Sequence, residues 1–189
     1  TNSRQLRQVV NENGASHLFG YDVADRLIEK VMFDGSRVNY AYDAAGRIVA
    51  TVESPDATAS IITRYRRDPM GRLLERSTAS TSTLFAYDLA GQLTQARNRH
   101  SWVQFIYDDV GQIVEERLHT AQSSHVVKHA HDELGNRLAT VLPGGRAIKR
   151  LYYGSGHLHQ VSVQDQVVSD LERDALHREI SRTQGSLVS

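Results

Sequence analysis

The stretch YAYDAAGRIVATV, residues 40–52, decides the fold of this chain. Before its centre, Val38, Tyr40 and Tyr42 occupy every second position. After its centre, Ile48 and Val52 continue the same alternation. A period of two with β-branched and aromatic side chains is typical of a strand, so the stretch predicts two strands joined by a short turn.

The turn itself depends on Asp43 and Gly46. An aspartate that opens a turn can accept hydrogen bonds from backbone amides two or three residues further on. Counting Tyr42 as the first motif position, glycine stands at the fifth, where it takes a positive φ at low cost, as a hairpin loop ending in a left-handed residue requires. Tyr42 and Ile48 then lie on the flanking strands and can pack into a common core.

The pattern occurs again along the chain, at intervals of about 22 residues. Its copies lie near residues 21–27, 42–48, 67–73, 87–93, 107–113, 131–138, 153–158 and 173–180. The residues that carry it are Tyr21, Asp22, Tyr42, Asp43, Gly46, Asp68, Gly71, Tyr87, Asp88, Gly91, Tyr107, Asp108, Gly111, Asp132, Gly135, Tyr153 and Asp174. Because a single hairpin is not stable alone, this recurrence predicts a repeat architecture in which neighbouring hairpins bury a shared apolar face.

Several copies depart from the motif. Arg67, His131 and Arg173 replace the tyrosine, and Gly154 replaces the aspartate in a copy that reads as shortened. At the fifth position, Asp25 and His177 replace glycine, and aspartate tolerates a positive φ better than histidine does. We expect these departures to weaken individual hairpins.

The sequence therefore predicts an all-β fold, a curved or spiralling antiparallel sheet of about eight hairpins. The hairpins form one repeat region over residues 1–189, open at its ends. Residues 168–182 could instead form a helix, with Ser169 as its cap and Leu171 and Ile180 on one side. The register of the repeats favours a hairpin in this segment.

Composition excludes several classes of function. The formal net charge is zero, which argues against a general nucleic-acid binder. The absence of cysteine excludes disulfides, thiolate chemistry and zinc sites that use sulfur. No apolar run approaches the roughly 20 residues of a membrane helix. The chain begins at Thr1 without a signal-peptide pattern, and we expect it to be a fragment.

The Tyr-Asp-x-x-Gly-Arg-Leu pattern at this period resembles the RHS, or YD-repeat, family. That family includes bacterial Rhs polymorphic toxins, shell components of insecticidal toxin complexes, and animal teneurins. The resemblance covers about residues 15–182 and implies a spiralling sheet that closes, in full-length members, into a hollow shell around a C-terminal toxic domain. The expected partners are therefore other repeats of the same shell and an encapsulated toxin domain.

The resemblance also implies a bacterial protein that is secreted or delivered at the cell surface, with type VI secretion and bacterial competition as its setting. Family members of the toxin type cleave themselves at an Asp-Pro-x-Gly-Leu signature. Asp68-Pro69-Met70-Gly71 is similar to it, but Arg72 follows and the stretch lies in register with the repeats. We expect an ordinary turn there, since proline suits the second position of a turn.

Catalysis and metal binding are not expected. One aspartate in each repeat is explained by turn closure, whereas a calcium site needs several oxygens that converge on one point. His129 and His131 share a strand face, as do His157 and His159, and the two pairs could form a transition-metal site only if they were brought together. We therefore expect no enzyme activity, no cofactor and no metal.

Two functions remain for such a sheet. The first is a structural fragment of an RHS-type shell that encapsulates a toxin domain. The alternative is a carbohydrate or cell-surface binding module, with exposed arginines and Trp102 as contacts. Because an open sheet exposes strand edges and an apolar face, we also expect isolated chains to self-associate.

Overall fold

A computed structural model of the chain describes residues 5–56, 58–185 and 187–188, and all of its regular structure is β-strand. The predicted all-β class is therefore confirmed. No helix in the described ranges could cross a membrane. The chain divides into two compact units, Thr1–Ala86 with Arg97–Arg99, and Tyr87–Ala96 with His100–Ser189. That the whole chain forms one repeat region stays a prediction.

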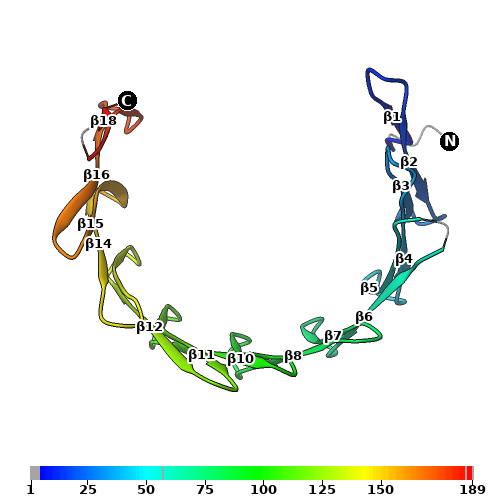
Figure 1. The fold of residues 1–189 in the computed structure, drawn as a ribbon, viewed down its shortest axis with the longest axis horizontal. Coiled ribbons are helices and arrows are strands. Elements are labelled where there is room, and N and C mark those ends of the chain that lie inside the picture. The colour runs from blue at the N-terminus through cyan, green and yellow to red at the C-terminus, as the bar shows by residue number, and fades with distance from the viewer. Residues whose placement is uncertain (1–4, 57, 186, 189) are drawn as a thin grey trace. The chain divides into compact units, whose positions relative to one another are not determined.

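The first unit is a sheet of hairpins that follow one another along the chain (Figure 1). Each strand pairs antiparallel with the next, from β1 to β8. The strands are β1 (Gln8–Val10), β2 (Ser16–Tyr21), β3 (Leu27–Val31), β4 (Arg37–Tyr42), β5 (Ile48–Ser54), β6 (Ile61–Arg67), β7 (Leu73–Ser77) and β8 (Ser82–Tyr87). Tyr87, the last residue of β8, belongs to the second unit.

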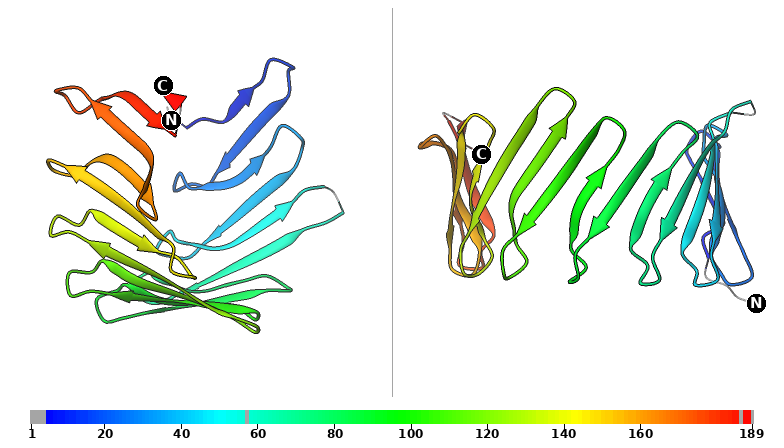
Figure 2. Two further views of the ribbon diagram at one scale, coloured as in Figure 1. Left: turned by 60° about the vertical axis from the view of Figure 1, so that its left-hand side comes forward. Right: turned by 90° about the horizontal axis from the view of Figure 1, so that it is seen from below.

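The second unit repeats this arrangement (Figure 2). From β10 to β18 each strand pairs antiparallel with the next, and β9 pairs with β10. The strands are β9 (Leu93–Arg97), β10 (Ser101–Tyr107), β11 (Ile113–Thr120), β12 (Ser124–His131), β13 (Arg137–Val141), β14 (Ala147–Tyr153), β15 (His157–Val163), β16 (Gln166–Arg173), β17 (Glu179–Gln184) and β18 (Leu187–Val188). Among the described residues, no pairing in the register of either unit joins its first strand to its last, so neither closes into a barrel.

The segment 168–182 is a hairpin, as the repeat register predicted. β16 and β17 pair with Leu171 opposite Arg182, and the turn between them spans residues 174–178. The helical alternative for this segment is wrong. Its helical periodicity is overridden because a strand in register continues the hydrogen-bond ladder of the preceding repeats.

Burial in the sheet is shallow. In β4, Val38, Tyr40 and Tyr42 are half-buried while Arg37 and Asn39 are exposed, which confirms the alternation read from the sequence. Leu171, at 3% exposed, is the one buried apolar side chain among the described residues. A single layer of strands has this property, because side chains on one face can be covered only by their neighbours in the same sheet.

The other buried side chains are polar and lie in pairs across adjacent strands. Thr51 of β5 lies directly opposite Thr63 of β6, and His129 of β12 lies opposite Thr140 of β13. His129 is bonded through Nε2 to a carboxylate oxygen of Glu116 at 2.9 Å. Burial at the middle of the hairpins therefore comes from close strand packing and not from an apolar core.

The repeat turns share one edge of each sheet. Successive strands run in opposite directions, so the turns that follow even-numbered strands all lie on the same side. Every predicted copy of the motif occupies such a turn, from 22–26 between β2 and β3 to 174–178 between β16 and β17. We call this row of turns along one edge of each sheet the turn ladder.

Candidate functional site: the turn ladder

Each turn of the ladder is closed by its aspartate. In the second repeat, one carboxylate oxygen of Asp43 accepts hydrogen bonds from the backbone amides of Ala45 and Arg47, both at 2.9 Å. The other carboxylate oxygen accepts from Arg47 Nε at 2.8 Å. The backbone adds Gly46 N to Asp43 O at 3.0 Å and Asp43 N to Arg47 O at 2.9 Å.

The acceptor role predicted for the aspartate is therefore present, although the amides lie two and four residues further on instead of two or three. The same bond to the amide four residues on recurs in every copy that has an aspartate. The aspartates concerned are Asp22, Asp43, Asp68, Asp88, Asp108, Asp132 and Asp174. Turn closure accounts for one carboxylate in each repeat.

The fifth motif position is left-handed in each turn, as the glycines predicted. Gly46 has φ of 77° and Gly111 has φ of 86°. Asp25 and His177, the two residues that replace glycine, adopt φ of 61° and 62°. A side chain at this position is strained. The remaining glycines of the ladder, which behave in the same way, are Gly71, Gly91, Gly135 and Gly156.

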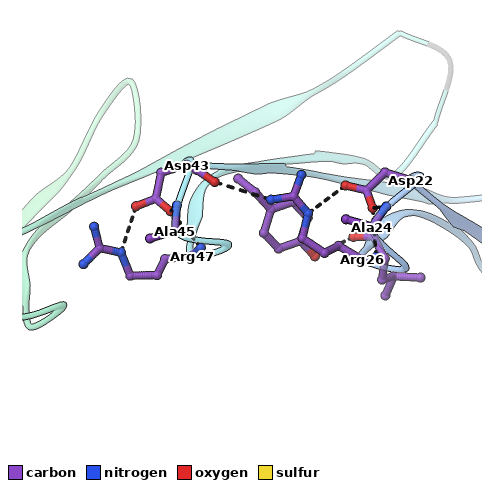
Figure 3. A network of polar contacts seen from close by, with 8 residues as sticks. Asp22, Ala24, Arg26, Asp43, Ala45 and Arg47 are labelled. Atoms are coloured by element: carbon purple, nitrogen blue, oxygen red, sulfur yellow. Dashed lines mark hydrogen bonds and ion pairs between the residues drawn. The ribbon is translucent and has the colours of Figure 1, made fainter.

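The sixth motif position connects one turn to the next. Arg26 Nε is paired with its own Asp22 at 2.7 Å, while Arg26 Nη1 donates to the backbone carbonyl of Asp43 at 3.4 Å (Figure 3). The same guanidinium lies 4.8 Å from the centre of the Tyr42 ring, close enough for a cation–π contact. Gln92 replaces arginine in this position and donates to the carbonyl of Gly111 at 3.3 Å. The sequence pattern showed this position recurring, but the bridging contact depends on how hairpins stack.

The first motif position makes a second connection between repeats. The Tyr42 hydroxyl donates to the carbonyl of Leu27 at 2.6 Å, and Leu27 is the seventh residue of the preceding repeat. Tyr107 donates to the corresponding carbonyl of Leu93 at 2.8 Å, and Tyr21 donates to the carbonyl of Leu6 at 3.0 Å. Burial raises the pKa of Tyr42 and of Tyr107 above the usual 10.0, which keeps both hydroxyls protonated as donors.

Two of the expected weak repeats keep this connection. Arg67 Nη1 donates to the carbonyl of Ile48, and Arg173 Nε donates to that of Leu158 at 3.3 Å. Ile48 is the seventh residue of its repeat, and Leu158 is the seventh residue of its repeat when counted from Tyr152, so arginine supplies the hydrogen bond that tyrosine supplies elsewhere. His131 differs, because its buried Nδ1 has no hydrogen-bond partner among the described residues.

The seventh repeat lies one residue earlier than the sequence suggested. Tyr152, and not Tyr153, donates its hydroxyl to the carbonyl of Arg137 at 3.2 Å and pairs across the bulge with Leu158. This repeat is therefore full-length, with Tyr153 in the place of the aspartate and His157 in the place of the arginine. The adjacent tyrosines made the register ambiguous in the sequence.

The electrostatics of the turns argue against acid–base chemistry. Hydrogen bonding from the Arg47 amide, together with its side chain, holds the pKa of Asp43 below the usual 3.8. Asp68, in the stretch similar to a cleavage signature, has its pKa lowered in the same way, first by the side chain of Arg72, which lies 2.7 Å away. Asp68 and Arg72 thus make an ordinary repeat turn. These carboxylates remain ionised and hydrogen-bonded, which suits a structural role.

The histidines form separate contacts and not a common ligand set. His129 and His131 lie with ring centres 6.4 Å apart, and His157 stacks on His177 at 3.9 Å. In the described ranges, no group of three or more histidine or acidic side chains is placed to hold a metal ion. Trp102 stacks on His119 of its own hairpin at 3.9 Å.

The tips of the turns carry exposed apolar side chains. Val23 in the first unit and Leu89 in the second are fully exposed. Similar side chains project from the third or fourth position of other turns, and the full set is Val23, Met70, Leu89, Val110, Leu134 and Leu176. A soluble protein seldom repeats an exposed apolar residue at one structural position, so this edge is suited to contact with another surface.

Sequence comparison identifies a family and individual proteins that are similar to this chain. Residues 1–165 match the teneurin YD-shell family. The chain is similar to double-stranded DNA deaminase toxin A of Burkholderia cenocepacia, with 35% identity over 97% of this chain and 14% of that protein. It is also similar to toxin protein Tse5 of Pseudomonas aeruginosa, with 40% identity over 36% of this chain and 5% of that protein. The chain thus spans a small part of both relatives.

Solved structures share the fold. The crystal structure of TcdB2-TccC3-Cdc42 superposes with a TM-score of 0.70 at 14% identity, covering 85% of this chain and 10% of that chain. The crystal structure of TcdB2-TccC3 gives a TM-score of 0.61 at 15% identity, covering 94% of this chain and 12% of that one. At this identity the likeness concerns the fold alone.

Proposed function

The chain belongs to the teneurin YD-shell family, and from that premise we propose that it is a wall segment of a shell that encloses a toxin domain. The observation that carries the proposal is the turn ladder. Within each unit, first motif residues such as Tyr42 and Tyr107 donate to the preceding repeat, and sixth residues such as Arg26 and Gln92 donate to the following turn. These contacts favour extension of one layer from repeat to repeat.

The shallow burial of the sheet suits a wall that is covered by other parts of the same shell. The sheet has one buried apolar side chain among its described residues, so it lacks the core of a self-contained binding domain. Apolar turn tips such as Leu89 and Leu134 offer a surface for neighbouring parts of the same shell. The toxin names of both curated relatives, each much longer than this chain, support a toxic domain as the cargo.

We further propose that the parent protein is secreted or delivered to other cells, which the toxin names of the relatives support. Contact-dependent delivery, including type VI secretion in bacterial competition, is part of this proposal. The segment itself is proposed to have no enzymatic activity, since its recurring carboxylates are engaged in turn closure.

The carbohydrate or cell-surface binding alternative is less well supported. Its main contact, Trp102, has one face covered by His119 at 3.9 Å, so only its other face could stack on a sugar. Saturable binding on a glycan array that is abolished by Trp102→Ala would favour the alternative.

Protease protection tests the shell. The whole gene product that contains these repeats is treated with a broad-specificity protease, and cleavage of the proposed toxin domain is followed. We expect this domain to resist in the native protein. Asp108→Ala, which removes a turn-closing carboxylate, should accelerate its cleavage, whereas Asp109→Ala, an exposed neighbour in the same turn, should not. Cleavage at the rate of the free domain, with the repeats intact, would refute encapsulation.

A further inference from the structure

Two exceptions to the motif meet at one joint of the ladder. In the chain's eight repeats, the fifth position is glycine except at Asp25 and His177, and the sixth is arginine, glutamine or asparagine except at His157. His157 of the seventh repeat and His177 of the eighth are in direct contact. Their rings are stacked with centres 3.9 Å apart and planes 11° from parallel. In five other repeats the sixth residue also approaches the next turn, but with a side chain that does not titrate near neutral pH: Arg26, Arg47, Gln92, Gln112 and Asn136.

The seventh turn also lacks a carboxylate that could neutralise a protonated histidine. The sixth residue of other repeats faces its own aspartate, as Arg26 faces Asp22 at 2.7 Å. In the seventh repeat the aspartate position holds Tyr153, whose ring centre lies 5.6 Å from His157 and 5.9 Å from His177. A phenol is neutral at pH values where histidine gains a proton, so it offers no compensating charge.

The charged groups around the stack are mostly positive or already paired. Arg173 of β16 donates to the carbonyl of His177 at 3.1 Å, and its charge acts on His157. Asp174, the acid of the eighth turn, is paired with Arg178 at 2.7 Å, and Glu172 of β16 lines one cavity with His177.

The other elements add little negative charge. On β15 and β16, His159 faces Asp170 at 3.9 Å. On β17, Glu179 is paired with Arg182 at 2.8 Å. From the preceding turn, the side chain in contact with the loop of His157 is the neutral amide of Asn136, close to Gly156. A proton added to His157 therefore meets the positive charge of Arg173.

We propose that the contact between the seventh and eighth repeats is an acid-sensitive joint, closed while His157 is neutral and opened when His157 gains a proton. Desolvation, followed by the positive charge of His177 and Arg173, holds the pKa of His157 below the usual 6.5, in agreement with this geometry. Because the closed state binds the proton less readily than the open state, the joint is at full strength above about pH 6.5 and weakens as the pH falls.

The histidine distribution limits the effect to one part of the chain. Of nine histidines, His17 lies in the first unit and the other eight lie in the second. Acid therefore adds positive charge mainly to the second unit, and the His157–His177 stack is the place where two of these side chains touch face to face between repeats. The inference does not depend on the proposed encapsulation, because it concerns the closure of one joint.

Amide hydrogen exchange of the 189-residue chain tests the joint. The amides of His177 and Arg178 are hydrogen-bonded within the eighth turn, and their protection factors, corrected for intrinsic exchange, are compared at pH 7.5 and 5.5. A histidine that is protonated only in the open state lowers protection about tenfold over this interval. The turn at 108–112, which has no histidine, serves as the internal reference.

Three variants decide the outcome. His157→Gln introduces the residue type that Gln92 and Gln112 supply at this motif position. It should reduce the fall in protection between pH 7.5 and 5.5 to less than about twofold. His177→Gly restores the usual glycine and should act in the same way, which protects the test against misfolding of one variant. His125→Gln, an exposed site on β12, should behave as wild type. Any of three results would overturn the proposal. Protection could fall equally in wild type and in both joint variants, it could fail to fall in wild type, or it could fall as much at 108–112 as in the eighth turn.

Discussion

Removal of a single oxygen atom tests the connection between repeats. Tyr42→Phe keeps the ring that lies 4.8 Å from the Arg26 guanidinium, but it removes the hydroxyl that donates to Leu27 O at 2.6 Å. The change leaves the turn, the strand and the apolar contacts in place. Any loss of stability therefore reports the bond between the first and second repeats.

The expected loss follows from the setting of this bond. A neutral intramolecular hydrogen bond contributes about 0.5–1.5 kcal/mol net, and a carbonyl left without its donor adds to the cost when it is shielded from water. Tyr42 is half-buried, so part of the solvation of the Leu27 carbonyl is recovered. We expect a loss of about 1 kcal/mol in the free energy of unfolding, which corresponds to about 2–4 °C in Tm for a chain of this length.

Urea unfolding followed by circular dichroism, with a check that the m value is unchanged, measures the loss. The matched control is Tyr40→Phe on the same strand, because the Tyr40 hydroxyl has no hydrogen-bond partner in the described part of the chain. Its free energy of unfolding should stay within about 0.3 kcal/mol of wild type. If the two variants unfold alike, the tyrosine hydroxyl does not connect the repeats and the reasoning fails.

Three other changes test the turns and the open sheet. Gly111→Ala should cost more than Gly46→Ala in the free energy of unfolding by urea. An added Cβ at Gly111 lies 2.8 Å from Gln92 Nε2 and displaces this group from its hydrogen bond to the Gly111 carbonyl, whereas at Gly46 it meets nothing closer than 4.0 Å. Equal costs would show that the backbone strain at positive φ is the whole effect. The folded chain holds the pKa of Asp43 below 3.8, so the stability that the ionised carboxylate contributes is present above that pH and is lost in stronger acid. Tm should therefore fall between pH 5 and 3, and it should fall less steeply in Asp43→Asn. Parallel plots of Tm against pH for the two proteins would contradict this. In sedimentation velocity, isolated chains should associate as their concentration rises, and they should bind an apolar dye. Leu134→Ser, which removes an exposed apolar side chain, should reduce both association and dye binding. A monomer that binds no dye at any concentration would mean that the apolar edge and face are covered.

The sequence predicted the features that are local. The alternation around Tyr40 specifies strands, and Gly46 specifies a left-handed residue, because both depend on side chains and backbone within a few residues. The choice of a hairpin at 168–182 over a helix also came from the sequence, but only through the register of the other repeats. One copy alone would have left that choice open.

The contacts between repeats could not be read in the same way. Arg67 and Arg173 were expected to weaken their hairpins because they are not tyrosine. In the structure each arginine still donates a hydrogen bond to a backbone carbonyl of the preceding repeat, as tyrosine does in other repeats. The reach of Arg26 to Asp43 depends on how consecutive hairpins stack, which the motif does not encode. The register of Tyr152 is set by the bulge opposite Leu158, and two neighbouring tyrosines hide it in the sequence.

The central claim is that these repeats are part of a closed wall. Electron cryomicroscopy of the whole gene product that contains them measures this directly. We expect residues 21–180 to form a continuous part of a hollow shell, with their turn tips in contact with other parts of the shell and separate density enclosed within it. Repeats with both faces and their turn tips open to solvent, and no enclosed density, would contradict it.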